Sequence, residues 1–81
     1  MRVTVLLFAQ LREAWGGGTL ELDLPDGATV AEAVQEALGR AELSACRELP
    51  LRYAVNEHYS DSAASLREND VLALLTPMAG G

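Results

Sequence analysis

Lysine and isoleucine are absent from this chain of 81 residues, which also has a single cysteine, Cys46, and a single histidine, His58. One cysteine excludes an internal disulfide, and one cysteine with one histidine gives no paired ligand spacing for a metal ion. We therefore expect Cys46 to be a small buried side chain and His58 to lie in a surface turn. Without lysine, copies of the chain cannot be linked into a polymer by isopeptide bonds to their own side chains.

Positive charge is also scarce, because six arginines stand against twelve acidic residues and leave a net charge of −6. No basic cluster is available to meet phosphates, which disfavours nucleic acid as a ligand, and a basic protein surface is the complementary partner. No apolar run is long enough to span a membrane, and the first ten residues are not expected to act as a signal peptide, so we expect no membrane partner. With no pair of cysteines to form a disulfide, we expect a cytoplasmic location. A domain this small has a marginal core and commonly needs a partner for stability.

Short apolar runs alternate with turn residues along the chain. The runs predict strands over 2–8, 19–24, 51–56 and 71–76, with a turn and a short return strand within 57–60. Residues 9–15 are expected to form one helical turn before three glycines, and residues 40–50 a further short helical piece. The stretch 65–70 predicts a turn in which Asn69 suits a left-handed conformation.

One substantial helix is predicted after residue 28. Thr29 and Glu32 have the spacing of a capping box, in which each side chain binds the other residue's backbone N–H. Apolar residues then recur at helical spacing on one face, and Gly39 is suited to the C-cap. The residues of this apolar face are Val30, Ala33, Val34, Ala37 and Leu38.

These elements predict an α+β domain in which a mixed sheet of four to five strands packs on one main helix. The first and last strands are apolar on both faces, which is typical of strands in the middle of a sheet. One helix covers one face, so the other face lacks a cover within the chain. We expect Phe8, Leu75 and Tyr59 to lie on this uncovered face as a protein interface. The alternative is that residues 40–50 fold over it.

The chain ends in Pro-Met-Ala-Gly-Gly, after the last predicted strand. We expect a domain over 1–76 and a flexible tail over 77–81. Two residues without a Cβ can pass through a channel too narrow for other side chains. Gly80 and Gly81 would thereby deliver the terminal carboxylate to an enzyme that activates it with ATP, after which a sulfur nucleophile would displace AMP and leave a thiocarboxylate.

Three stretches carry a resemblance to a known family. They are VLLFAQLRE at 5–13, AVNEHY at 54–59 and LRENDVLALLTPMAGG at 66–81. With the order of elements and the glycine pair, the chain resembles the ubiquitin-like β-grasp sulfur carriers and, more narrowly, the small subunits of molybdopterin synthase. The sequence departs from that family's pattern at Thr76, where a proline is usual, and at Asn69, where a glycine is usual.

The resemblance implies a function and a set of site residues. Gly81 would carry the thiocarboxylate and Gly80 would line the channel, with Pro77, Met78 and Ala79 contacting the partner. The partners would be an adenylating enzyme that uses ATP and the large synthase subunit, within which a pterin precursor receives the sulfur. The chain itself would bind no cofactor, and the family's apolar contact patch matches Phe8, Tyr59 and Leu75.

Three other functions remain open at this stage. The same chemistry could serve thiamine, tRNA thiolation or cysteine synthesis. The chain could be a ubiquitin-like modifier attached through Gly81 to lysines of other proteins. It could also be a plain interaction domain in which the glycine pair has no role.

Overall fold

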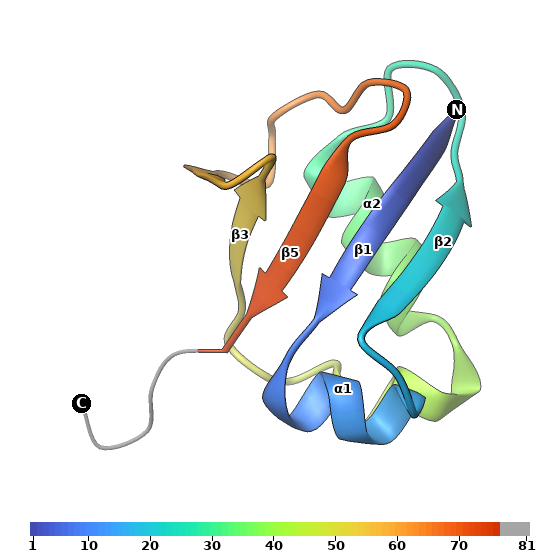
Figure 1. Ribbon diagram of the computed structural model, residues 1–81, viewed down its shortest axis with the longest axis vertical. Helices are drawn as coiled ribbons and strands as arrows, with labels where there is room; N and C mark the ends of the chain where they lie inside the picture. Colours follow the sequence, from blue (N-terminus) through green and yellow to red (C-terminus); the bar gives the residue numbers. More distant parts are fainter. Residues whose placement is uncertain (77–81) are drawn as a thin grey trace.

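The structure is a computed structural model that describes residues 1–76, so the predicted tail 77–81 lies outside the described residues. Within residues 1–76, five strands form one mixed sheet in the order β2-β1-β5-β3-β4. Figure 1 shows this sheet in front of α2, with α1 below its lower end. The strands are β1 (Arg2–Leu7), β2 (Thr19–Asp23), β3 (Arg52–Val55), β4 (His58–Ser60) and β5 (Val71–Leu75). The helical segments are α1 (Ala9–Trp15), α2 (Val30–Leu38) and the 3₁₀ helix η1 (Ala41–Cys46).

The first and last strands are neighbours at the centre of the sheet, as their apolar composition predicted. β1 and β5 run parallel, with Leu6 opposite Ala73. β2 lies antiparallel on the outer side of β1, and β3 lies antiparallel on the outer side of β5. β4 closes the order as a short antiparallel partner of β3. All five predicted strands are therefore present.

α2 begins with the predicted capping box. The Thr29 hydroxyl accepts a hydrogen bond from the backbone N–H of Glu32 at 3.3 Å, and the Glu32 carboxylate accepts one from the backbone N–H of Thr29 at 3.0 Å. These two bonds satisfy amide groups that the first turn of a helix leaves without partners. Four of the five residues on the predicted apolar face are buried, namely Val30, Ala33, Ala37 and Leu38.

The core lies between the sheet and the helices. Alternate strand residues supply it because successive side chains of a strand point to opposite faces. Val3, Val5 and Leu7 of β1 and Leu72 and Leu74 of β5 are all at most 1% exposed. Removing this apolar surface from water is the main favourable contribution to folding.

The segment after α2 does not cover the sheet face opposite α2, which was one of the two alternatives for that face. Residues 41–46 form η1, which packs against α1 and α2 rather than over the uncovered sheet face. Leu43 and Cys46 anchor it in the core. Gly39 is the C-cap of α2, but its φ of −74° is right-handed because the chain continues directly towards η1. The alternative in which residues 40–50 cover the open face is therefore wrong.

The segment 9–15 is also longer as a helix than predicted. It forms the seven-residue helix α1 instead of one turn, and the Leu11 side chain of this helix is fully buried. Ala9 enters this helix at a φ of +50°, in the left-handed region. Among residues 1–76, no helix combines the length and the apolar character that crossing a membrane requires.

Candidate functional site

The candidate site is the face of the sheet opposite α2, which we call the open face. Its side chains come from the strand positions that alternate with the core, as predicted from the two-sided apolar pattern. Leu6 of β1 and Val71, Ala73 and Leu75 of β5 point to this face and are all half-buried. Phe8, directly after β1, is 41% exposed, which is unusual for a large apolar side chain.

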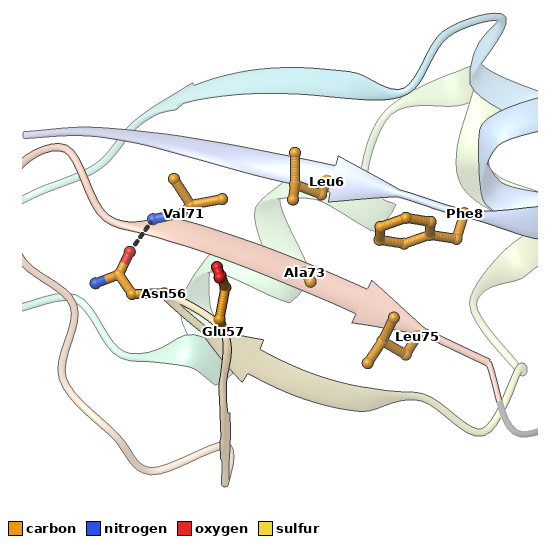
Figure 2. A pocket seen from close by; sticks show the side chains of 7 residues that line it. All are labelled: Leu6, Phe8, Asn56, Glu57, Val71, Ala73 and Leu75. Atoms are coloured by element: carbon orange, nitrogen blue, oxygen red, sulfur yellow. Dashed lines mark hydrogen bonds between the residues drawn. The ribbon is translucent and has the colours of Figure 1, made fainter.

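These side chains line a shallow hollow of about 520 Å³. Its residues are Leu6, Phe8, Asn56, Glu57, Val71, Ala73 and Leu75. Figure 2 shows Phe8 and Leu75 at one end of the hollow and Asn56 with Glu57 at the other. The hollow is therefore an apolar trough with one polar end.

Tyr59 extends the open face beyond the hollow. Strand register places Leu6 beside Ala73, Ala73 beside Ala54 and Ala54 beside Tyr59, so these residues form one row across four strands. Residues paired directly across neighbouring strands share a face. Tyr59 is 81% exposed at the end of this row. The structure thus brings the three predicted patch residues to one face, although Tyr59 is not part of the hollow.

The polar end of the hollow is the turn between β3 and β4. Asn56 and Glu57 form this two-residue turn with φ values of +50° and +72°. The Asn56 backbone N–H donates to the Val71 carbonyl at 2.8 Å, and its side-chain oxygen accepts from the Val71 N–H at 2.9 Å (Figure 2). The turn is therefore fixed to the first residue of β5, which sets the position of Glu57.

Sequence reasoning did not select Asn56 and Glu57 as site residues. The sequence carried a usable signal, because an asparagine followed by one residue between two strand runs predicts a tight hairpin turn. Their place beside β5 depends on the order of strands, which the local pattern does not contain.

Other residues singled out in the sequence lie away from the hollow. Cys46 is buried in the core, as expected, whereas His58 is exposed in β4 rather than in a turn. Trp15 anchors the end of α1 by donating its ring N–H to the Thr19 carbonyl at 2.9 Å. Across residues 1–76, no group of three or more His, Cys, Asp or Glu side chains is arranged to hold a metal ion.

The predicted tail residues Pro77, Met78, Ala79, Gly80 and Gly81 lie outside the described residues. The last described residue, Thr76, follows β5 directly beyond Leu75. The described part of the chain therefore ends beside the end of the open face formed by Phe8 and Leu75.

Comparison with known proteins assigns the chain to a family. The model of the ThiS family matches residues 5–81. The chain belongs to the ThiS family. Among curated proteins, it is 33% identical over 85 residues to the molybdopterin synthase sulfur carrier subunit of Arabidopsis thaliana, a match that covers 100% of this chain and 84% of that protein.

Solved structures similar to this ThiS-family chain come from several contexts. SAMP1 from Haloferax volcanii has a TM-score of 0.86 and 25% identity, with 100% of both chains covered. A putative molybdopterin converting factor subunit 1 from Pyrococcus furiosus has a TM-score of 0.84 and 28% identity, covering 96% of this chain and 99% of that one. A chain of the BexX/CysO complex from Amycolatopsis orientalis has a TM-score of 0.72 and 27% identity, covering 98% and 99%.

These likenesses confirm the predicted fold class. The chain has the ubiquitin-like β-grasp fold, with a mixed five-stranded sheet on one main helix. The predicted membership of a sulfur-carrier family is confirmed by the ThiS-family match. The similar structures include a SAMP1, a molybdopterin converting factor subunit and a chain of a CysO complex, so structural similarity alone does not identify the pathway that uses the sulfur.

Proposed function

We propose that this chain is the sulfur carrier subunit of a molybdopterin synthase. The observation that carries the proposal is its 33% identity, over the full length of the chain, to the Arabidopsis protein of that name. The open face supports the proposal, because a carrier that delivers its terminus to another protein needs a docking surface. Apolar patches of this kind commonly mark such surfaces.

The proposed chemistry takes place at the carboxylate of Gly81. An adenylating enzyme joins this carboxylate to the AMP moiety of ATP and releases pyrophosphate. A sulfur nucleophile then attacks the carbonyl carbon and displaces AMP, which leaves a thiocarboxylate. In the complex, the thiocarboxylate sulfur bonds to an electrophilic carbon of a pterin precursor and forms a thioester. Water then attacks the thioester carbonyl and breaks its bond to sulfur, which returns Gly81 as a carboxylate and leaves the sulfur on the pterin for the dithiolene of molybdopterin.

In this proposal the chain supplies delivery and its partners supply catalysis. Gly80 lets the tail pass close to the backbone of a narrow channel, because glycine has no Cβ. Pro77, Met78 and Ala79 contact the partner along the same path. Phe8, Leu75 and Tyr59 contact the large subunit and hold the body of the domain beside the channel entrance. The chain binds no cofactor of its own, and ATP is bound by the activating enzyme.

A second candidate function has a specific observation in its favour. SAMP1, named in full as a small archaeal modifier protein, has a TM-score of 0.86 to this chain. A modifier would be attached through Gly81 to amines of other proteins. The absence of lysine allows single attachments of this kind but excludes chains built on the modifier's own lysines.

Native mass spectrometry of the protein recovered from its own cells tests the proposal. We expect a stable complex with a larger chain and, after release, a terminus in which sulfur has replaced one oxygen. A tail joined by an amide bond to unrelated proteins supports the modifier instead. A thiocarboxylate on a chain whose partner is an enzyme of thiamine, tRNA or cysteine synthesis assigns the same chemistry to another pathway.

A further inference from the structure

Glu57 differs from the other carboxylates around the open face. Four nearby carboxylates bind groups of this chain. Glu21 accepts a hydrogen bond from the Thr4 hydroxyl, and Asp23 forms an ion pair with Arg2. Glu68 accepts from the Arg2 backbone N–H, and Asp70 accepts from Asn56 and from the Arg67 backbone N–H. Within residues 1–76, the Glu57 carboxylate accepts no hydrogen bond and forms no ion pair. Figure 2 shows its carboxylate on the open side of the sheet, turned towards β5.

The backbone of Glu57 is in the left-handed region, where a residue with a Cβ is strained. A two-residue turn with both φ values positive favours asparagine followed by glycine. This turn has asparagine first, but Glu57 occupies the second position at a φ of +72°. A left-handed conformation is unfavourable for a residue with a Cβ. Strain of this kind commonly accompanies a functional side chain.

A partner that covers the hollow must also cover Glu57. A carboxylate removed from water without a countercharge is strongly destabilising, whereas one that gains a cation is tolerated or favoured. The position of Glu57 at the end of an apolar trough therefore penalises neutral or acidic partners and admits basic ones.

Within residues 1–76, no arginine forms an ion pair with Glu57. Arg52 shares the open face, but it lies opposite Leu75, at the other end of the hollow. The chain's own segment 77–81 contains only proline, methionine, alanine and glycine, so it offers Glu57 no positively charged side chain. A second copy would bring a further net charge of −6 against the first. Like net charges oppose association, so the charge balance favours a different, basic protein.

We propose that the hollow is the docking site for a segment of another protein in which an apolar side chain stands next to an arginine or lysine, and that Glu57 selects this positive charge. The apolar side chain lies between Phe8 and Leu75, and the cation pairs with the Glu57 carboxylate. The inference deepens the proposed function, in which the large synthase subunit supplies this segment.

Three variants separate the charge of Glu57 from its effect on the fold. Glu57→Gln removes the charge with little change in shape. Glu57→Gly removes the whole side chain and relieves the left-handed strain, so its unfolding temperature should rise. Glu36→Gln, on the exposed face of α2, changes the net charge equally but away from the open face. A purely structural role for Glu57 predicts that stability and binding fall together.

The first measurement is calorimetric titration of each variant with the large synthase subunit from the same cells. We expect Glu57→Gln and Glu57→Gly to bind about tenfold more weakly than the parent chain, and Glu36→Gln to bind as the parent does. Glu57→Gly should therefore be the more stable protein and the weaker binder. If the parent binds the subunit and both Glu57 variants bind equally well, the inference is wrong while the proposed function stands.

The second measurement does not depend on the large subunit. Two synthetic peptides, acetyl-Leu-Arg-Leu-amide and acetyl-Leu-Glu-Leu-amide, are titrated into the ¹⁵N-labelled chain by NMR at concentrations on the order of 1 mM and above. The arginine peptide should shift the amides of Leu6, Glu57 and Ala73, and Glu57→Gln should abolish these shifts. The glutamate peptide should not shift them.

The outcomes separate the two proposals. Arginine-dependent shifts at the hollow without binding of the large subunit would retain the inference and contradict the proposed partner. Shifts that do not depend on Glu57, or no shifts at the hollow, overturn the inference whatever the large subunit does. Sedimentation of the free chain as a dimer that Phe8→Ala dissociates also overturns it, because the occupant is then a second copy.

Discussion

The side-chain amide of Asn56 donates a 2.9 Å hydrogen bond to the carboxylate of Asp70, which joins the β3–β4 turn to the residue directly before β5. The same asparagine binds both backbone groups of Val71. Asp70 in turn accepts from the Arg67 backbone N–H at 2.8 Å, so it closes the preceding turn as well. Two turns that are distant in sequence are thus held together at one end of the open face.

Loss of the Asn56 side chain should destabilise the domain. Asn56→Ala removes two side-chain hydrogen bonds and leaves a left-handed residue without the tolerance of asparagine for that conformation. We expect a loss of about 2 kcal/mol in the free energy of unfolding, measured by urea denaturation. Gln10→Ala, at an exposed position of α1, is the control and should change it little. Equal stability of Asn56→Ala and the parent would contradict the bridging role.

Glycine should stabilise the domain at residue 9 and destabilise it at residue 31. Ala9 has a φ of +50°, where a Cβ is unfavourable, so Ala9→Gly should raise the free energy of unfolding by about 1 kcal/mol. Ala31 is an exposed residue of α2, where the same substitution should lower it by about 1 kcal/mol. Thermal unfolding of the two variants measures both changes. A stability loss in Ala9→Gly would show that the local strain is not relieved by glycine.

Alanine substitutions of the neighbouring residues Leu7 and Phe8 should affect stability and binding differently. Phe8 is 41% exposed on the open face, so Phe8→Ala should lower the free energy of unfolding by about 1 kcal/mol or less. Affinity for the large subunit should fall about tenfold or more, as measured by calorimetry. Leu7 is 1% exposed and lies on the core side, so Leu7→Ala should lower the free energy of unfolding by about 2–5 kcal/mol. Unchanged affinity in Phe8→Ala would remove the open face from the interface.

Gly81 should be required for sulfur transfer but not for folding. Gly81→Val places a branched side chain at the reacting terminus, so formation of the acyl-adenylate and of the thiocarboxylate should be lost. Mass spectrometry after incubation with the activating enzyme, ATP and sulfide detects both products. Circular dichroism should be unchanged, and Glu36→Gln should react as the parent does. Full activity of Gly81→Val would favour an interaction domain in which the glycine pair has no role.

Local patterns predicted most of the elements in this fold. The alternation Leu20, Leu22, Leu24 identified a half-buried strand, and the spacing of Thr29 and Glu32 identified the start of α2. Asn69 also has the predicted left-handed conformation, with a φ of +68°. These features depend on residues close in sequence, so a window of several residues contains the whole cause.

The features that sequence reasoning missed depend on distant residues. α1 is longer than one turn because Leu11 is buried in the core cluster that also contains Leu43, which belongs to a different part of the chain. Glu57 reaches the hollow because β3 pairs with β5 and not with β1. The open face itself was predictable, since the two-sided apolar strands required either a second cover or a partner.

The central position of β5 also has a consequence for how the chain acquires its structure during synthesis. Among the elements of residues 1–76, β1 is made before all the others and its parallel partner β5 after all of them. Contacts between distant parts of a chain form slowly, because a long loop must close before they contribute. The central pairing of the sheet therefore cannot form until residues 71–75 have been made. A translation product that stops before residue 71 therefore lacks both the central strand pairing and the β5 side of the hollow, so it has neither a complete sheet nor a complete open face.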